Sequence, residues 1–220
     1  HPYLQCESTL DIILVIEGSE DLTEDGWLSV KDFTERFVKS LDMSTGGIEL
    51  AILLYGGPER QPYFNLCRGD EYDEAEWDPA EVCRVKWVEH FTSNSSKALE
   101  SVKNMEWPRG GRMTHLALEF AESELGDGRS ETKSVVFVLT AGAPNAQRLA
   151  QEAAESLKEK TRLMFGLAGT DANSMSGYYE RMVDRPVPRN IVRAQSVTAV
   201  SGPSFINRVI SDMCPDLEIY

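Results

Sequence analysis

Three apolar segments decide the fold class: DIILVI at Asp11–Ile16, IELAILLY at Ile48–Tyr55 and SVVFVL at Ser134–Leu139. Each is a nearly continuous apolar run of strand length, which is typical of strands that are buried on both faces. Gly56-Gly57-Pro58 ends the second of them. Such strands belong to parallel sheets that helices cover on both sides.

Helical patterns separate these strands. One apolar face is formed by residues at helical spacing, namely Trp27, Val30, Phe33, Phe37, Val38 and Leu41. Further helices are expected at Thr114–Leu125, Ala146–Lys160 and Ser204–Met213, and further strands at Val85–Phe91, Leu163–Leu167 and Ile191–Val200. This alternation predicts an α/β fold: a doubly wound, mostly parallel central sheet of about six strands with helices on both faces. No repeat or linker interrupts the pattern, so residues 1–220 are expected to form a single domain.

The charge of the chain excludes two classes of partner. Lysine and arginine number 22 and the acidic residues 36, so the net charge is 22 − 36 = −14. A surface of this sign does not suit the phosphate backbone of nucleic acids or an anionic membrane. The longest apolar runs are also far too short to span a bilayer. The expected partner is therefore another protein, and an electrostatically steered partner should be basic or a metal cation.

Four cysteines and one sequon indicate where the protein works. Cys6 and Cys214 bracket the domain, whereas Cys67 and Cys83 bracket an acidic segment. Of the three possible pairings we favour Cys6–Cys214 with Cys67–Cys83; the alternative is four free thiols in a cytosolic protein. Disulfides are typical of extracellular proteins. Asn94-Ser95-Ser96 is a possible N-glycosylation site, which agrees with an extracellular or cell-surface location.

Residues 58–92 are less regular and are interpreted as an insertion. Between its two cysteines lie the acidic residues Asp70, Glu71, Asp73, Glu74, Glu76, Asp78 and Glu81. The segment lacks the glycine and the glutamate spacing of an EF-hand loop. Two interpretations stay open: a surface that docks a basic partner or calcium, or a solvated loop that a disulfide staples.

Three loops should form the ligand site, because open α/β sheets bind ligands at the carboxyl ends of their strands. They read EGSED at residues 17–21, GGRMT at residues 110–114 and TAGAP at residues 140–144. His115, Trp107 and Arg109 lie beside the second loop; we expect a surface histidine and leave open whether the other two bind a partner or pack.

With its first strand and E-G-S, its G-G-x-x-T-x-L-A-L segment and its V-V-F-V-L-T-x-G segment, the chain resembles the von Willebrand factor type A domain family, which has a Rossmann-like fold. In that family the first loop is D-x-S-x-S, the second supplies a threonine and the third an aspartate. The resemblance implies that these residues hold a divalent cation, usually magnesium. A carboxylate of the binding partner then completes the coordination.

This chain keeps two of the five family positions, Ser19 and Thr114. Glu17 and Asp21 replace an aspartate and a serine, and Ala141 replaces the third-loop aspartate and supplies no ligand. In one interpretation Glu17, Ser19, Asp21 and Thr114 still bind one cation weakly, as magnesium, manganese or calcium.

In the other interpretation the site is vestigial and no cofactor is bound. Asp21 then caps the following helix together with Glu24, and Ser19 and Thr114 bond to nearby backbone. The loss at Ala141 favours this second interpretation.

The function that these features predict is non-enzymatic. The chain has no G-x-S-x-G elbow, P-loop, G-x-G-x-x-G or H-E-x-x-H motif. We expect an extracellular protein-binding or adhesion module with a weakened or lost metal site. The alternative is a structural building block of a larger surface or matrix assembly, which binds its neighbours without metal.

Overall fold

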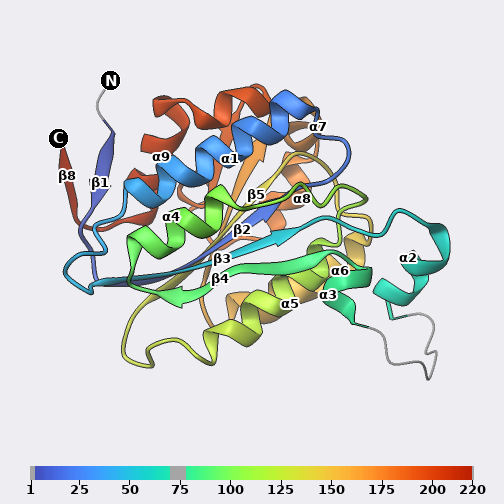
Figure 1. Cartoon of the computed structure of the whole chain (residues 1–220), viewed down its shortest axis with the longest axis horizontal. Helices are drawn as coiled ribbons and strands as arrows, with labels where there is room; N and C mark the ends of the chain where they lie inside the picture. The colour runs from blue at the N-terminus through green and yellow to red at the C-terminus, as the bar shows by residue number, and fades with distance from the viewer. Residues whose placement is uncertain (1–2, 70–77, 220) are drawn as a thin grey trace.

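The computed structural model describes residues 3–69 and 78–219, and its centre is one six-stranded sheet (Figure 1). The strand order is β4-β3-β2-β5-β6-β7. Their bounds are β2 Leu10–Glu17, β3 Ile48–Tyr55, β4 Val85–Thr92, β5 Ser134–Thr140, β6 Arg162–Ala168 and β7 Ile191–Ala194. All neighbouring pairs are parallel except β3 and β4. The predicted fold class is confirmed.

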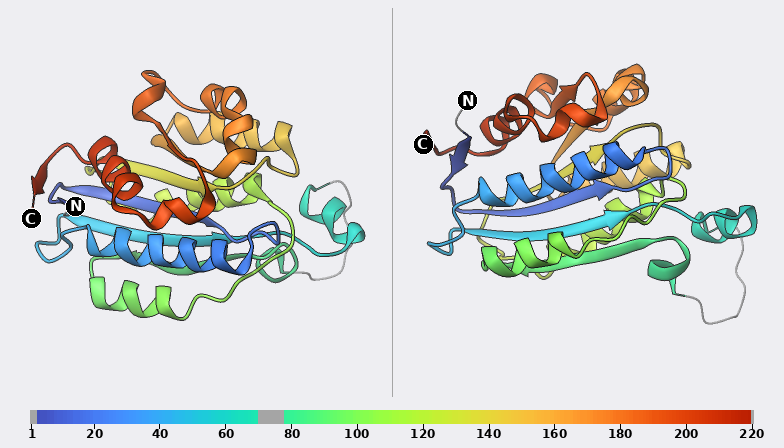
Figure 2. Two further views of the ribbon diagram at one scale, coloured as in Figure 1. Left: turned by 90° about the horizontal axis from the view of Figure 1, so that it is seen from above. Right: turned by 45° about the horizontal axis from the view of Figure 1, so that its top comes forward.

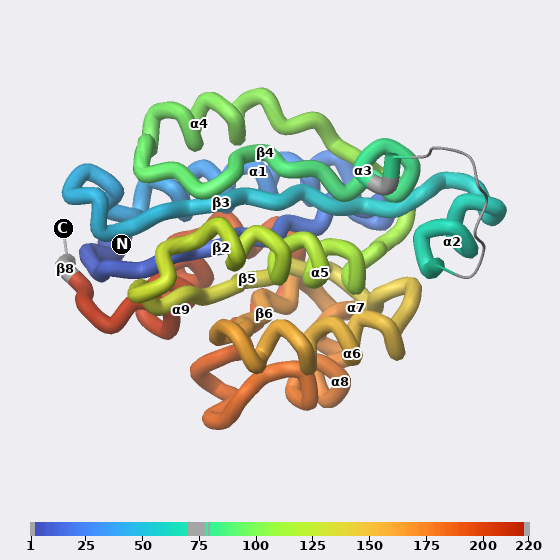
Figure 3. The backbone as a smooth tube through the Cα atoms, turned by 90° about the horizontal axis from the view of Figure 1, so that it is seen from below, coloured from blue at the N-terminus to red at the C-terminus, as the bar shows by residue number. Residues whose placement is uncertain are grey.

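Helices cover both faces of this sheet. The described helices are α1 Glu24–Lys39, α2 Gln61–Cys67, α3 Pro79–Val82, α4 Ser95–Lys103, α5 Thr114–Leu125, α6 Gln147–Lys158, α7 Gly169–Ser174, α8 Ser176–Arg181 and α9 Pro203–Met213. Two 3-10 helices lie at Val187–Arg189 and Val197–Ser201. Helices α1, α4 and α9 lie on one face (Figure 2), and α5 and α6 lie on the other (Figure 3).

The central strand β2 shows why the apolar runs are continuous. Ile12, Leu14 and Ile16 belong to the core beneath α1, α4 and α9, whereas Ile13 and Val15 belong to the core beneath α5 and α6. All five are fully buried. Because successive side chains of a strand point to opposite faces, a strand that is covered twice must be apolar at every position.

Aromatic rings fix the long helices to the sheet. Phe33 of α1 lies 5.7 Å from Phe205 of α9 and 6.2 Å from Phe137 of β5, measured between ring centroids. Phe37 stacks on the same Phe137 at 6.5 Å. Burial of one such ring contributes about 1.5–3 kcal/mol. These contacts hold α1 in place, and the first candidate loop leads into this helix.

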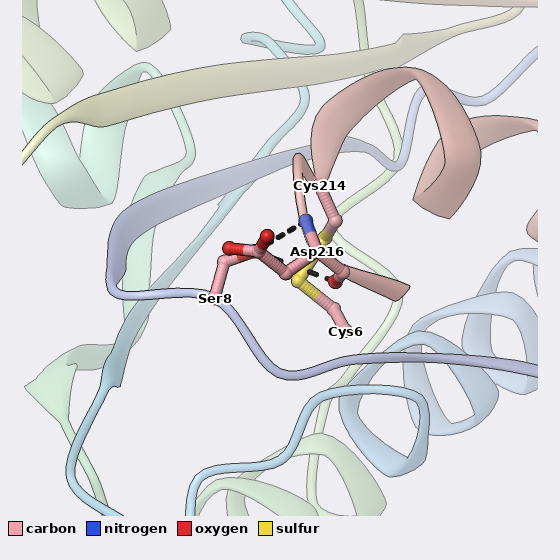
Figure 4. Close-up of a disulfide and its surroundings, with 4 residues drawn as sticks. All are labelled: Cys6, Ser8, Cys214 and Asp216. Atoms are coloured by element: carbon pink, nitrogen blue, oxygen red, sulfur yellow. Dashed lines mark hydrogen bonds between the residues drawn. A yellow bond between two sulfur atoms is a disulfide. The ribbon is translucent and has the colours of Figure 1, made fainter. Parts of the chain in front are cut away.

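The two ends of the described chain lie side by side. Strand β1, Leu4–Cys6, pairs antiparallel with β8, Leu217–Ile219. The Cys6–Cys214 disulfide joins the two segments, and the Ser8 hydroxyl accepts a hydrogen bond of 3.1 Å from the backbone N–H of Asp216 (Figure 4). A second disulfide joins Cys67 to Cys83. Both bridges have the pairing that the cysteine positions favour.

The last strand is shorter than the sequence predicts. Strand β7 ends at Ala194, and the 3-10 helix Val197–Ser201 follows where we expected strand as far as Val200. The backbone carbonyl of Ala194 accepts a hydrogen bond of 2.9 Å from the Asn173 side chain. The chain then leaves the sheet and turns Val200 into the core near α1.

Candidate functional site

The three candidate loops meet at one edge of the sheet. The first follows β2, the third follows the adjacent β5, and the second leads into α5. Backbone hydrogen bonds fasten the first two loops together: the N–H of Glu20 donates to Gly110 at 2.8 Å, and the N–H of Arg109 donates to Gly18 at 2.8 Å. The N–H of Asn145 donates to the carbonyl of Arg112 at 3.1 Å, which joins the third loop to the second.

Gly110 allows the second loop to approach the end of β3. Its φ of +69° lies in the left-handed region, and a Cβ atom there would lie 1.9 Å from the carbonyl oxygen of Gly57. A side chain at this position would therefore be strained and would also collide with backbone. The close approach brings Arg112 over the first loop.

Arg112 is the centre of the site. Its Nε donates to Glu17 Oε1 at 2.5 Å, and its terminal nitrogens donate to Asp21 Oδ2 at 2.6 Å and to the Ala143 carbonyl at 3.4 Å. The Arg112 side chain is only 12% exposed and that of Glu17 only 2%. Gly142 makes room for it, since a Cβ atom on Gly142 would lie 2.6 Å from the guanidinium carbon. A single guanidinium thus links the first and third loops.

The Glu17 carboxylate is fully engaged. Its second oxygen, Oε2, accepts a hydrogen bond of 3.0 Å from the Thr140 hydroxyl and another from the backbone N–H of Ala141. The extra methylene of glutamate, relative to the family's aspartate, extends the carboxylate to this third loop. Ala141, which has lost the ligand side chain, contributes its N–H instead.

Burial and charge oppose each other at Arg112 and act together at Tyr55. Burial would lower the pKa of Arg112, but the carboxylates of Glu17 and Asp21 outweigh it and raise that pKa above its ordinary value. Burial and the nearby Glu17 charge raise the pKa of Tyr55, which lies beneath the loops. Arg112 therefore stays charged, and Tyr55 stays a neutral hydroxyl at physiological pH.

The predicted role of Asp21 in a vestigial site, as the cap of the following helix, differs from what the structure shows. Thr23, not Asp21, caps α1: its hydroxyl accepts from the N–H of Gly26 at 3.1 Å. Helix α1 begins at Glu24, too late for Asp21 to act as its cap, and Arg112 holds the Asp21 carboxylate. The expected capping box of Asp21 with Glu24 is therefore wrong.

Ser19 and Thr114 do not bond to the backbone as expected. The Thr114 hydroxyl lies 3.4 Å from the Tyr55 hydroxyl, to which it donates. The Ser19 hydroxyl is fully buried and has no hydrogen-bond partner among the described residues. The two family residues that the chain keeps are thus buried beneath the Arg112 pairs. Among the described residues of these loops, the unpartnered hydroxyl of Ser19 is the feature that would suit a cation.

The other oxygen atoms that could act as metal ligands do not fit a divalent cation. Magnesium requires near-octahedral oxygen ligands and tolerates little displacement. Here both oxygens of Glu17 and one oxygen of Asp21 already accept hydrogen bonds, and the guanidinium that they bind is itself a cation. Within residues 3–69 and 78–219, no group of three or more histidine, cysteine or acidic side chains could hold a metal ion.

Arg112 is the functional residue that the sequence interpretation missed. The signal was present, because the first loop holds three acidic residues and an arginine lies two positions before Thr114 in the second loop. The pairing becomes visible only when Gly110 and Gly142 bring the loops together.

The neighbouring side chains complete this edge. Trp107 donates from its indole N–H to the Ser19 carbonyl at 3.0 Å and stacks on Trp27, with ring centroids 6.3 Å apart. The Arg109 guanidinium carbon lies 4.4 Å from the centroid of the Trp107 ring. Trp107 therefore packs and supports the first loop, while the Arg109 side chain lies exposed on top of it.

His115 is buried and not on the surface, where we expected it. It is 3% exposed, and its Nε2 lies 2.9 Å from the carbonyl oxygen of Cys67. Its first-turn position on α5 turns it inward, toward the end of α2. Burial lowers its pKa, and Nδ1 has no partner within the described part of the chain.

The other sequence candidates lie away from the loops. Asn94 caps α4, with its side-chain oxygen accepting from the N–H of Lys97 at 3.0 Å, and it is exposed. Asp78 accepts from the N–H of Ala80, and Glu81 pairs with Lys86 at 2.7 Å. The remaining members of the acidic segment lie outside the described residues: Asp70, Glu71, Asp73, Glu74 and Glu76.

Comparison with known protein families identifies the family to which this chain belongs. Residues 11–204 match the model of the von Willebrand factor type A domain. Because the match covers most of its length, the chain belongs to this family. Comparison with curated protein sequences finds no match.

Solved structures share the fold over the whole chain. Proximal thread matrix protein 1 from the mussel byssus is 16% identical, with a TM-score of 0.74, and the match covers 96% of this chain and 49% of that chain. The manganese-loaded TRAP protein of Plasmodium vivax is 19% identical, with a TM-score of 0.67, over 100% of this chain and 79% of that one. The open pilus adhesin SpaC of Lactobacillus rhamnosus GG is 13% identical, with a TM-score of 0.67, over 96% and 30%.

These identities show a common fold and no more. The chain spans about half the length of the mussel protein. Across the described residues, no helix has the length and apolar composition needed to cross a bilayer.

Proposed function

We propose that this domain is an extracellular protein-binding module of a surface or matrix assembly, and that it binds without a divalent cation. The observation that carries the proposal is the Arg112 guanidinium, which pairs with Glu17 and Asp21 at the junction of the three loops. Its positive charge compensates carboxylates that would otherwise need a metal ion. The proposal treats residues 1–220 as one domain without enzymatic activity.

Three further observations support an adhesive or structural role. The structural neighbours include a thread matrix protein and a pilus adhesin. The chain has two disulfides, which are typical of oxidising compartments. The exposed Asn94 is available for glycosylation, because capping uses its side-chain oxygen and leaves its side-chain nitrogen free.

A metal-free site changes the chemistry of recognition. Glu17 and Asp21 together with Arg112 carry a net charge of −2 + 1 = −1. A partner carboxylate would be repelled there, whereas a metal ion would attract it. The loops are accordingly proposed to contact neutral or basic groups of the partner.

A solid-phase binding assay tests the proposed function. The domain is immobilised and presented with collagen, fibronectin, laminin and a second preparation of the domain, in EDTA and in magnesium. We expect saturable binding to at least one of these proteins with the same affinity in both buffers. Binding that EDTA abolishes would contradict the metal-independent module, and an absence of binding to all four would contradict a matrix or assembly role.

A further inference from the structure

A cleft at the opposite end of the strands from the Arg112 loops is lined by positively charged side chains, although the protein as a whole is acidic. It has a volume of about 680 Å³ and lies at the amino ends of β5 and β6, between the loop before β7 and the end of α9. Its lining includes the cations Lys133, Lys160, Arg162, Arg185 and Arg189 and the carboxylates Asp184 and Asp212. A volume of this size lies within the range of ligand sites.

Most of this positive charge is uncompensated. Lys160 pairs with Glu122, and Asp212 pairs with Arg208 at 2.6 Å, so these two residues are neutralised. The other four cations and Asp184 sum to 4 − 1 = +3, in a chain of net charge −14. Asp212 also lies close enough to Arg162 to attract it electrostatically. Lys133, Arg185 and Arg189 make no ion pair with any residue that the structure describes.

Arg162 is fixed at the floor of the cleft by neutral groups. Its Nε donates to the Asn190 side-chain oxygen at 2.7 Å, and a terminal nitrogen donates to the Arg189 carbonyl at 2.7 Å. The side chain is half-buried, and burial together with the neighbouring Arg189 charge lowers its pKa. A guanidinium that is oriented, partly desolvated and close to a second one is positioned to receive an anion.

We propose that this cleft binds an acidic peptide segment of a partner protein. Its cations come from three separated stretches of chain, the starts of β5 and β6 and the loop before β7, so a ligand must extend across the cleft to meet them all. Pro186 and Pro215, which are both exposed, add apolar surface to the lining, and this suits the side chains of a peptide. Arginine forks bind carboxylates with two parallel hydrogen bonds.

The charge of the whole molecule adds selectivity. The net negative charge of the chain disfavours non-specific contact with an acidic segment, and the cations of the cleft attract such a segment, so the partner is oriented before contact. The cleft and the Arg112 loops lie at opposite ends of the strands, so the domain would bind two partners at once. This site does not depend on the proposed role of the Arg112 loops.

Fluorescence anisotropy with a labelled peptide of alternating glutamate and glycine tests the proposal. The test variant is Arg185→Gln with Arg189→Gln, since both side chains are exposed and support no described contact. The matched control is Arg60→Gln with Lys103→Gln, which removes two exposed cations far from the cleft. We expect saturable binding that weakens with salt, falls at least about tenfold in the test variant and changes less than about twofold in the control.

Three results would overturn the proposal: no saturable binding, an equal loss in the test and control variants, or tighter arginine-dependent binding of heparin than of the peptide. The last result would assign the cleft to a sulfated polysaccharide. Circular dichroism of each variant establishes that the fold is intact before binding is compared.

Discussion

At the scale of single residues, the proposed exchange of a metal ion for a guanidinium accounts for the unusual loop sequence. Glu17 extends to the N–H of Ala141, and Asp21 pairs with the outer edge of Arg112. The substitutions relative to the family pattern thus form one consistent set. A buried carboxylate without a cation would be costly, and Arg112 supplies the cation within the chain.

Arg112→Ala should destabilise the domain by about 3–5 kcal/mol, because it leaves the buried Glu17 carboxylate unpaired. Urea unfolding measures the change. Arg148→Ala is the matched control, since Arg148 forms an exposed pair with Glu152 within α6 that is worth only about 0.3–0.5 kcal/mol. Equal effects of the two substitutions would contradict the central role of the Arg112 pairs.

His115 should make stability depend on pH. Burial holds its folded pKa below the ordinary value of 6.5, so the unfolded state binds more protons as pH falls through that value. The contribution of neutral His115 to stability is therefore fully present above about pH 6.5, and the free energy of unfolding declines as the pH falls below that value. His115→Gln should flatten the decline between about pH 7.5 and 5.5, measured by urea unfolding. An unchanged slope in His115→Gln would contradict this assignment.

At the scale of elements, the sequence predicted the central strands well because each is an uninterrupted apolar run. Those runs record burial on both faces, which a sequence reveals directly. The short pair β1–β8 was not predicted, since strands of three residues have no periodicity. Strand β7 was overextended because an apolar 3-10 helix has the same composition as a strand.

The sequence predicted where the three loops lie, but it did not predict the hydrogen bonds that their side chains make. The position of the three loops follows from the rule for parallel sheets, and the structure brings Glu17, Asp21, Ser19 and Thr114 to one edge. The hydrogen bonds of these residues depend on Arg112, whose reach is set by loop geometry. A capping pattern of Asp21 and Glu24 was therefore misleading, and Thr23 holds that role.

Thr23→Ala should remove the cap of α1 and cost about 1 kcal/mol of stability, whereas Thr23→Asn should retain most of it. Thermal or urea unfolding of the two variants measures the difference. If the two substitutions had the same effect, the hydroxyl of Thr23 would not be the cap.

At the scale of the whole molecule, the two disulfides close loops of very different length. Cys6 and Cys214 are separated by 208 positions, and Cys67 and Cys83 by 16. In the chain-entropy model the first bridge contributes about 5 kcal/mol and the second about 3 kcal/mol. Replacing both cysteines of a bridge by serine should follow this order in urea unfolding. A larger loss from the Cys67–Cys83 bridge would show that local structure, and not chain entropy, sets its contribution.

Arg112 is proposed to take the place of the metal ion, and calorimetric titration of the metal-stripped domain with magnesium and manganese tests this replacement. Arg112 holds the carboxylates of Glu17 and Asp21 that a cation would need. We therefore predict no saturable binding at millimolar concentrations of either metal ion. Saturable binding to the unmodified domain that disappears in Thr114→Ala would contradict the claim, because it would show that the loops still hold a divalent cation.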